Sequence, residues 1–219
     1  MRSRKNIVDF SAASGDVRIG GAFDAADWGF SWPVSRGWDG RKMVYFCSVT
    51  DDDGLVMHCF VTHAFAEDFD HFFDPDVLEN TGEETLVVCC RDGNVISEGF
   101  ASSSDTTGPS VMLEDESAGP VFATILDATD APKNMDLDAR IGASREERQA
   151  FNSKVDGAKL GGAPDSMGTS VFPHDDDESW ELVMQLYEEP MRLNVGPCPL
   201  LFLFRRVDGD EAMLTLLGE

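Results

Sequence analysis

One pattern of residues occurs twice along the chain and limits its fold more than any other feature. Ile19-Gly-Gly-Ala-Phe-Asp24 is followed by Trp32-Pro33, and Leu160-Gly-Gly-Ala-Pro-Asp165 is followed by Phe172-Pro173. Two apolar runs come after each aromatic-Pro pair. A glycine pair lets the chain turn sharply, and the proline fixes the end of the loop. The pattern predicts an internal duplication, with a first pseudo-repeat at about 15–130 and a second at about 155–219.

The apolar runs are short and rich in valine, leucine and phenylalanine, which is typical of β-strands. They lie at Met43–Thr50, Leu55–Thr62, Thr85–Cys90, Pro120–Leu126, Glu181–Tyr187, Pro199–Val207 and Ala212–Leu217. Asp51-Asp52-Asp53-Gly54 and Asp208-Gly209 predict tight turns, so the runs on either side of each turn should form a hairpin.

Helical signals are fewer. Ser144-Arg-Glu-Glu147 is a capping box that predicts a helix to about Val155, and Ala66–Phe73 predicts a short helix that Pro75 limits. With 42% hydrophobic and 10% aromatic residues, the chain can bury a sizeable core. We therefore expect a strand-rich α+β fold, built as two pseudo-repeated halves in one compact domain over residues 1–219.

Charge is distributed very unevenly along this acidic chain, whose formal net charge is −24. Between Lys42 and Lys133 there is one basic residue, Arg91, against nineteen Asp and Glu. Such a surface repels nucleic acid, anionic lipid and phosphorylated substrates, and it attracts basic proteins over long distances. The charge therefore predicts a cationic protein partner, without direct contact to nucleic acid or membrane.

Other features indicate a cytoplasmic protein. No apolar run approaches the ~20 residues that a membrane-spanning helix needs, and Met1–Lys5 is not followed by an apolar signal core. The cysteines are odd in number, and Cys47, Cys59, Cys89 and Cys90 lie in strand-like runs. Buried, reduced thiols are the expected state.

The second copy of the repeated pattern resembles a known family. Lys159-Leu-Gly-Gly-Ala-Pro164, followed by Val183-Met184-Gln185-Leu186 and Pro199-Leu-Leu-Phe-Leu-Phe204, is similar to the YwqG-like bacterial domains of unknown function. The first copy departs from the family pattern, with Phe23 in place of the proline and Cys47–Val49 in place of the strand glutamine. The resemblance implies a mixed, strand-rich fold, no established chemistry, and association with bacterial toxin–immunity loci.

The chain contains no familiar catalytic motif. It lacks the glycine-rich nucleotide loops, the Gly-x-Ser-x-Gly elbow and a Cys-x-x-Cys pair. His58, His63 and His71 could be metal ligands, but the odd spacing of His58 and His63 places them on opposite faces of a strand. His174–Glu178 lacks the ligand pattern of a calcium loop. We expect no enzyme activity, no metal and no cofactor.

Two functions of different classes remain, and the first is an immunity or antitoxin-type protein. It would neutralise a basic, nucleic-acid-directed toxin through an acidic surface in which phenylalanines serve as apolar anchors. The predicted partner-binding residues are Asp51, Asp52, Asp53, Glu67, Asp68, Phe69, Asp70, Phe72, Asp74, Asp76, Glu83 and Glu84.

The second is a small-ligand or carbohydrate-binding module, which would use a cleft between the repeats lined by Trp32, Trp38, Phe172 and Trp180. An acidic mimic of nucleic acid that blocks a DNA-binding protein is a third option.

Overall fold

The computed structural model describes residues 4–37, 40–62, 85–97, 99–111, 119–128, 142–165, 171–173, 179–187 and 200–217. The strands are β1 (Lys5–Ala12), β2 (Val17–Ile19), β3 (Val44–Thr50), β4 (Val56–Val61), β5 (Thr85–Arg91), β6 (Asn94–Val95), β7 (Val121–Asp127), β8 (Lys159–Leu160), β9 (Trp180–Tyr187), β10 (Leu200–Arg206) and β11 (Ala212–Leu217). A 3₁₀ turn, η1, spans Ala25–Trp28, and the helix α2 spans Arg145–Val155.

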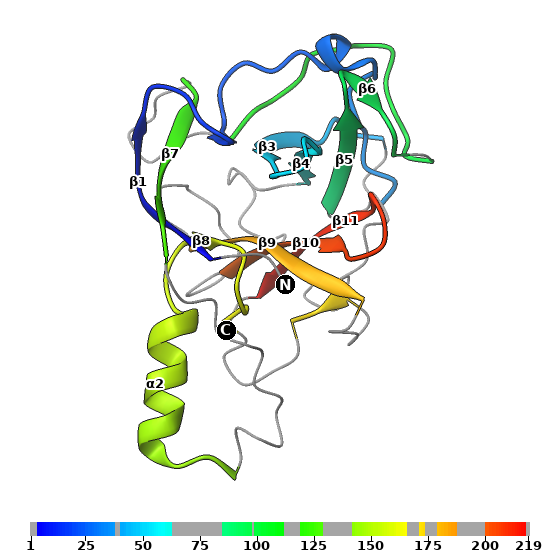
Figure 1. Cartoon of the computed structure of the whole chain (residues 1–219). Helices are drawn as coiled ribbons and strands as arrows, with labels where there is room; N and C mark the ends of the chain where they lie inside the picture. The colour runs from blue at the N-terminus through cyan, green and yellow to red at the C-terminus, as the bar shows by residue number, and fades with distance from the viewer. Residues whose placement is uncertain are drawn as a thin grey trace.

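These strands form one antiparallel sheet in the order β11-β10-β9-β8-β1-β7-β2-β3-β4-β5-β6 (Figure 1). β1 and β7 pair in its middle. We term β2–β5 the first wing and β8–β11 the second wing. The sheet curls so that β5 approaches β11, and Thr85 Oγ1 donates a hydrogen bond to the Leu214 carbonyl at 3.1 Å. The predicted strand-rich fold is confirmed.

The two Gly-Gly pairs have the same local geometry in the two wings. Gly20 and Gly21 have φ values of 63° and 79°, and Gly161 and Gly162 have values of 61° and 79°. The first glycine of each pair donates its N–H to the adjacent strand, Gly20 to Phe46 at 2.9 Å and Gly161 to Val183 at 3.0 Å. Each pair therefore turns the chain away at the end of a short strand. The duplication itself stays a prediction, which superposition of the wings would test.

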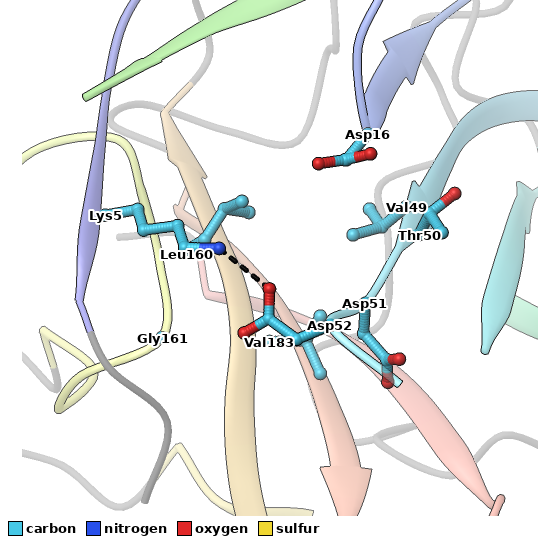
Figure 2. A pocket seen from close by; sticks show the side chains of 9 residues that line it. All are labelled: Lys5, Asp16, Val49, Thr50, Asp51, Asp52, Leu160, Gly161 and Val183. Carbon is cyan, nitrogen blue, oxygen red and sulfur yellow. Dashed lines mark hydrogen bonds and ion pairs between the residues drawn. The ribbon is translucent and has the colours of Figure 1, made fainter. Parts of the chain in front are cut away.

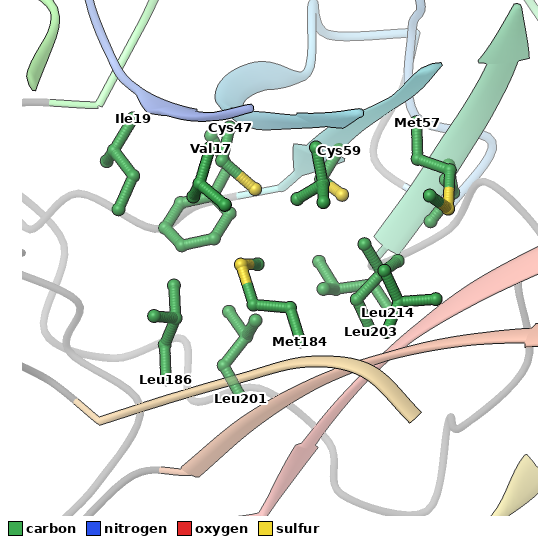
Figure 3. Close-up of a cluster of buried hydrophobic side chains, with 14 of the residues drawn as sticks. Val17, Ile19, Cys47, Met57, Cys59, Met184, Leu186, Leu201, Leu203 and Leu214 are labelled. Atoms are coloured by element: carbon green, nitrogen blue, oxygen red, sulfur yellow. The ribbon is translucent and has the colours of Figure 1, made fainter. Parts of the chain in front are cut away.

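The largest apolar cluster fills the space between the wings (Figure 3). Val17, Ile19, Cys47 and Cys59 project from the first wing, and Met184, Leu186, Leu201, Leu203 and Leu214 face them from the second. Because both wings contribute to this cluster, each covers the apolar face of the other.

Two further clusters cover the outer faces of the wings. The first contains Trp32, Tyr45 and Phe60, and the second contains Trp180, Phe202 and Phe204. β4, β5 and β10 are therefore apolar on both faces. This double burial explains why their sequences are continuous apolar runs with little polar alternation.

The structure confirms most of the predicted elements. The seven predicted strands correspond to β3, β4, β5, β7, β9, β10 and β11. Gly54 has a φ of 80° in the β3–β4 turn, and β10 and β11 form the second predicted hairpin. The capping box is formed, because the Ser144 N–H donates to Glu147 Oε2 at 2.7 Å and the Glu147 N–H donates to Ser144 Oγ at 3.2 Å. The helix predicted at Ala66–Phe73 lies outside the described residues.

Candidate functional site

The predicted partner-binding residue Asp51 has a structural role at the β3–β4 turn. Its Oδ1 accepts hydrogen bonds from the backbone N–H groups of Asp53 and Leu55, each at 3.1 Å. Its Oδ2 lies 2.6 Å from Arg205 Nη1 of β10, and the Asp51 side chain has no exposed surface. A buried ion pair thus joins the first wing to the second.

Asp52 and Asp53 are more exposed but are also paired within the chain. The Asp52 side chain is 75% exposed and lies 2.8 Å from the Lys5 ammonium. Asp53, which is 54% exposed, accepts from Arg205 Nη1 at 2.9 Å. These carboxylates remain accessible to solvent, so a partner that reaches this turn would compete with the two internal cations.

Basic residues from distant parts of the chain therefore surround the acidic turn. Arg91 lies 2.8 Å from Asp210, and its guanidinium also donates to the Asp53 carbonyl at 3.1 Å. Arg205 contacts Asp210 at 3.3 Å. The sequence has no Lys or Arg from Met43 to Cys90, yet the fold brings Lys5, Arg91 and Arg205 to the turn. The charge there is much lower than the local sequence indicates.

A shallow pocket lies beside the turn, between the wings (Figure 2). It is lined by Lys5, Asp16, Val49, Thr50, Asp51, Asp52, Leu160, Gly161 and Val183. The Lys5 ammonium points across the pocket to Asp52 (Figure 2). The hydrogen bond to Asp52 raises the pKa of Lys5, and the charges of Asp52, Asp127 and Asp16 add to this shift. The pocket therefore stabilises an ammonium group.

The other predicted partner-binding residues, from Glu67 to Glu84, lie outside the described residues. The residues that flank their segment are described, and they lie far from the acidic turn. Val61, at the end of β4, pairs with Thr85 at the start of β5, whereas Val56 beside the turn pairs with Cys90. The segment and the turn are thus attached to opposite ends of the six-residue strand β4, roughly 20 Å apart.

The aromatic residues predicted to line a ligand cleft do not share one site. Trp32 is fully buried in the outer cluster of the first wing, where its Nε1 donates to the Met43 carbonyl at 2.7 Å. Trp180 is buried in the outer cluster of the second wing, and Phe172 packs there against Phe204. Trp38 lies outside the described residues.

His58 is a buried residue of the first wing. Its ring centroid lies 4.5 Å from that of Trp28 and 4.9 Å from that of Phe23. Burial, with a smaller effect of Arg18, lowers the pKa of His58 to about 3, so its ring is neutral at physiological pH. His63, His71 and the loop His174–Glu178 are outside the described residues. Within the described ranges, no group of three or more His, Cys, Asp or Glu side chains is arranged to hold a metal ion.

The second wing contains a buried polar cluster that the sequence did not predict. Its residues Lys159 and Gln185 were recognised only as positions of the family-like motif. Lys159 of β8 is fully buried and is paired in register with Gln185 of β9. The Gln185 side chain accepts from the Asp165 N–H at 2.7 Å and donates to the Gly157 carbonyl at 3.0 Å. Burial lowers the pKa of Lys159 to about 7, with Arg4 adding to the shift. The lysine and the glutamine of the family-like motif thus meet in one site.

No family model matches this chain, and no curated protein matches it either. The YwqG-like resemblance therefore stays a prediction. Among the described helices, none is long and apolar enough to cross a membrane.

Proposed function

We propose that this chain is a bacterial immunity or antitoxin-type protein that binds and neutralises a basic, nucleic-acid-directed toxin. The concentration of negative charge supports this proposal most directly, with nineteen acids and one base between Lys42 and Lys133. Carboxylates in that region would pair with the lysines and arginines that such a toxin uses to contact phosphate.

The geometry of the acidic turn changes which residues are expected to make the contact. Asp51 is enclosed and paired with Arg205, so it supports the turn and does not face a partner. Asp52 is the most exposed carboxylate of the three, and its partner Lys5 is itself partly exposed. An incoming cation could displace Lys5 from Asp52 without unfolding the turn.

The proposal assigns the main contact to the segment from Glu67 to Asp76, which lies outside the described residues. That segment has five acidic residues and no Lys or Arg, whereas three cations already compensate the charge of the turn. Asp52 would then act at the rim of the contact, where a charge mainly changes the association rate.

The experiment compares capture of proteins from the native cells by three baits. These are the wild-type chain, a variant with Glu67, Asp70 and Asp76 changed to Lys, and a control with Asp175, Asp176 and Asp177 changed to Lys. Wild type and control should retain a basic protein that the first variant loses. The association rate of that purified protein should fall steeply with added salt.

A partner that is acidic, or an association rate indifferent to salt, would contradict the proposal. Loss of binding in the control alone would place the interface in the second pseudo-repeat.

A further inference from the structure

Arg18, Ser48 and His58 form a row of polar side chains across the first wing. Arg18 of β2 is directly opposite Ser48 of β3, and Ser48 is directly opposite His58 of β4. Residues that oppose each other on neighbouring strands project from the same face of the sheet. This is the outer face, where Phe23 and Trp28 contact the His58 ring.

The hydrogen bonds along this row fix the position of the His58 proton. Tyr45 Oη lies 2.6 Å from Ser48 Oγ, which lies 2.7 Å from His58 Nδ1. If Tyr45 donates to Ser48 and Ser48 donates to Nδ1, both hydroxyl protons are used and the imidazole proton lies on Nε2. In the reverse direction, Nδ1–H donates to Ser48 and Ser48 donates to Tyr45. The Tyr45 hydroxyl proton then has no acceptor, and Nε2 has no donor. The first arrangement is therefore favoured, and it leaves one buried donor, Nε2–H, without a partner.

Arg18 supplies a second buried donor without a partner. Its Nε makes no hydrogen bond, while its Nη2 donates to the Ala22 carbonyl. Its Cζ lies 5.7 Å from the centroid of the Tyr45 ring. No carboxylate of the described residues pairs with this guanidinium, although the whole chain has forty-one acidic residues. A buried donor left unsatisfied costs about 1–3 kcal/mol. The two donors of this row therefore require an acceptor that none of the described residues supplies.

We propose that Arg18 and His58 bind a small-molecule carboxylate, while Ser48 orients the imidazole. A carboxylate offers two acceptor oxygens and a single negative charge, which match the two N–H donors, one of them on the positively charged guanidinium. The imidazole adds no second charge, because it is neutral at physiological pH. The aromatic rings of Phe23, Trp28 and Phe30 around His58 favour an apolar body on the ligand.

The short η1 turn lies over His58 and is the part of its covering that could move to admit a ligand. The η1 turn is only four residues long, and Ala26 and Asp27 within it are exposed. It lies between Gly21 and Gly29, whose φ values are 79° and 78°. Trp28, the last residue of the turn, is half-buried over His58. Displacement of this one turn would remove Trp28 from the imidazole while the sheet stays intact.

The test titrates the full chain, labelled with ¹⁵N at histidine, with benzoate at constant ionic strength. We expect a saturable change of the His58 Nε2 signal at millimolar benzoate. Benzamide, which has the same shape without the charge, should produce no such change, and inorganic phosphate should bind more weakly. Absence of a saturable change with benzoate, or equal binding of benzamide or phosphate, would overturn the proposal.

Variants identify the residues that bind. Arg18→Gln should weaken benzoate binding at least about tenfold, since it removes the charge-assisted hydrogen bonds. Arg41→Gln, at an exposed arginine, is the matched control and should bind as wild type does. Arg18→Lys keeps the charge without an Nε donor and should also weaken binding. If the Arg18→Lys variant binds benzoate as tightly as the wild type does, Nε has no role in binding. The benzoate titration of the wild type decides the proposal even if a variant fails to fold.

Discussion

Asp51 and Asp52 are neighbours in sequence, but burial separates their roles. Asp51→Asn should lower the free energy of unfolding by about 1.5–3 kcal/mol, because it removes the buried carboxylate from Arg205, which keeps only its more exposed partners Asp53 and Asp210. Asp52→Asn should change it by at most about 1 kcal/mol, because the exposed pair with Lys5 is screened by water. Urea unfolding of both variants at neutral pH measures the difference. Equal losses would show that the buried pair does not join the wings.

The buried imidazole of His58 predicts a pH dependence of stability. Its folded pKa of about 3 lies below the ordinary value of 6.5. As the pH falls below about 6.5, the unfolded chain binds a proton that the folded chain does not, so stability falls by roughly 1.4 kcal/mol per pH unit. His58→Gln should lack this contribution. The free energy of unfolding of the wild type, minus that of the variant, should therefore decrease by about 3 kcal/mol from pH 6.5 to about pH 4. A constant difference would mean that His58 titrates normally.

At the scale of elements, the Gly-Gly turns need their glycines for two separate reasons. A side chain at Gly21 would have a strained backbone, and its Cβ would lie 2.6 Å from Cδ of Pro120. Gly54 has a similar φ of 80° but no atom within 4 Å of such a Cβ. Gly54→Ala should cost about 1–2 kcal/mol from the backbone alone. Gly21→Ala should lower the free energy of unfolding by about 1–3 kcal/mol more, because the Cβ also meets Pro120. Urea unfolding of both variants measures the difference. Similar costs would show that Pro120 can move aside.

The elements also show what the sequence could predict. β3 and β4 are joined by five residues, Asp51 to Leu55, with strong local turn signals, so the hairpin was predicted with nearly correct bounds. β2, β6 and β8 have two or three residues and cannot show a periodic pattern. β1 was missed because irregular register after Ile7 and after Asp9 interrupts its alternation.

The site was harder to predict because its contacts are between distant residues. Arg205 is separated from Asp51 by 154 positions, so no local pattern indicates that the acidic turn is neutralised. The same holds for the burial of Lys159 and for the unpartnered N–H donors of Arg18 and His58, which depend on which strands become neighbours. The repeated Gly-Gly pattern was the one sequence signal near both polar sites, since Arg18 and Lys159 each lie two residues before the first glycine of a pair.

For the whole molecule, the shared apolar cluster predicts that the two wings unfold together. Each wing covers the apolar face of the other, so separation would expose both at once. Native-state hydrogen exchange should therefore give the same maximal opening free energy for amides of β4 and β10. A lower value confined to one wing would show that the wings are independent folding units.

The central position of β1 has a consequence for the synthesis of the chain. Lys5 pairs with Asp127 on one side and with Leu160 on the other. β1 leaves the ribosome before both of its partner strands and must therefore wait for more than a hundred further residues. At ordinary translation rates of about 5–20 residues per second, this interval is on the order of ten seconds. During that time β1 is open to chaperones and to mispairing with other chains.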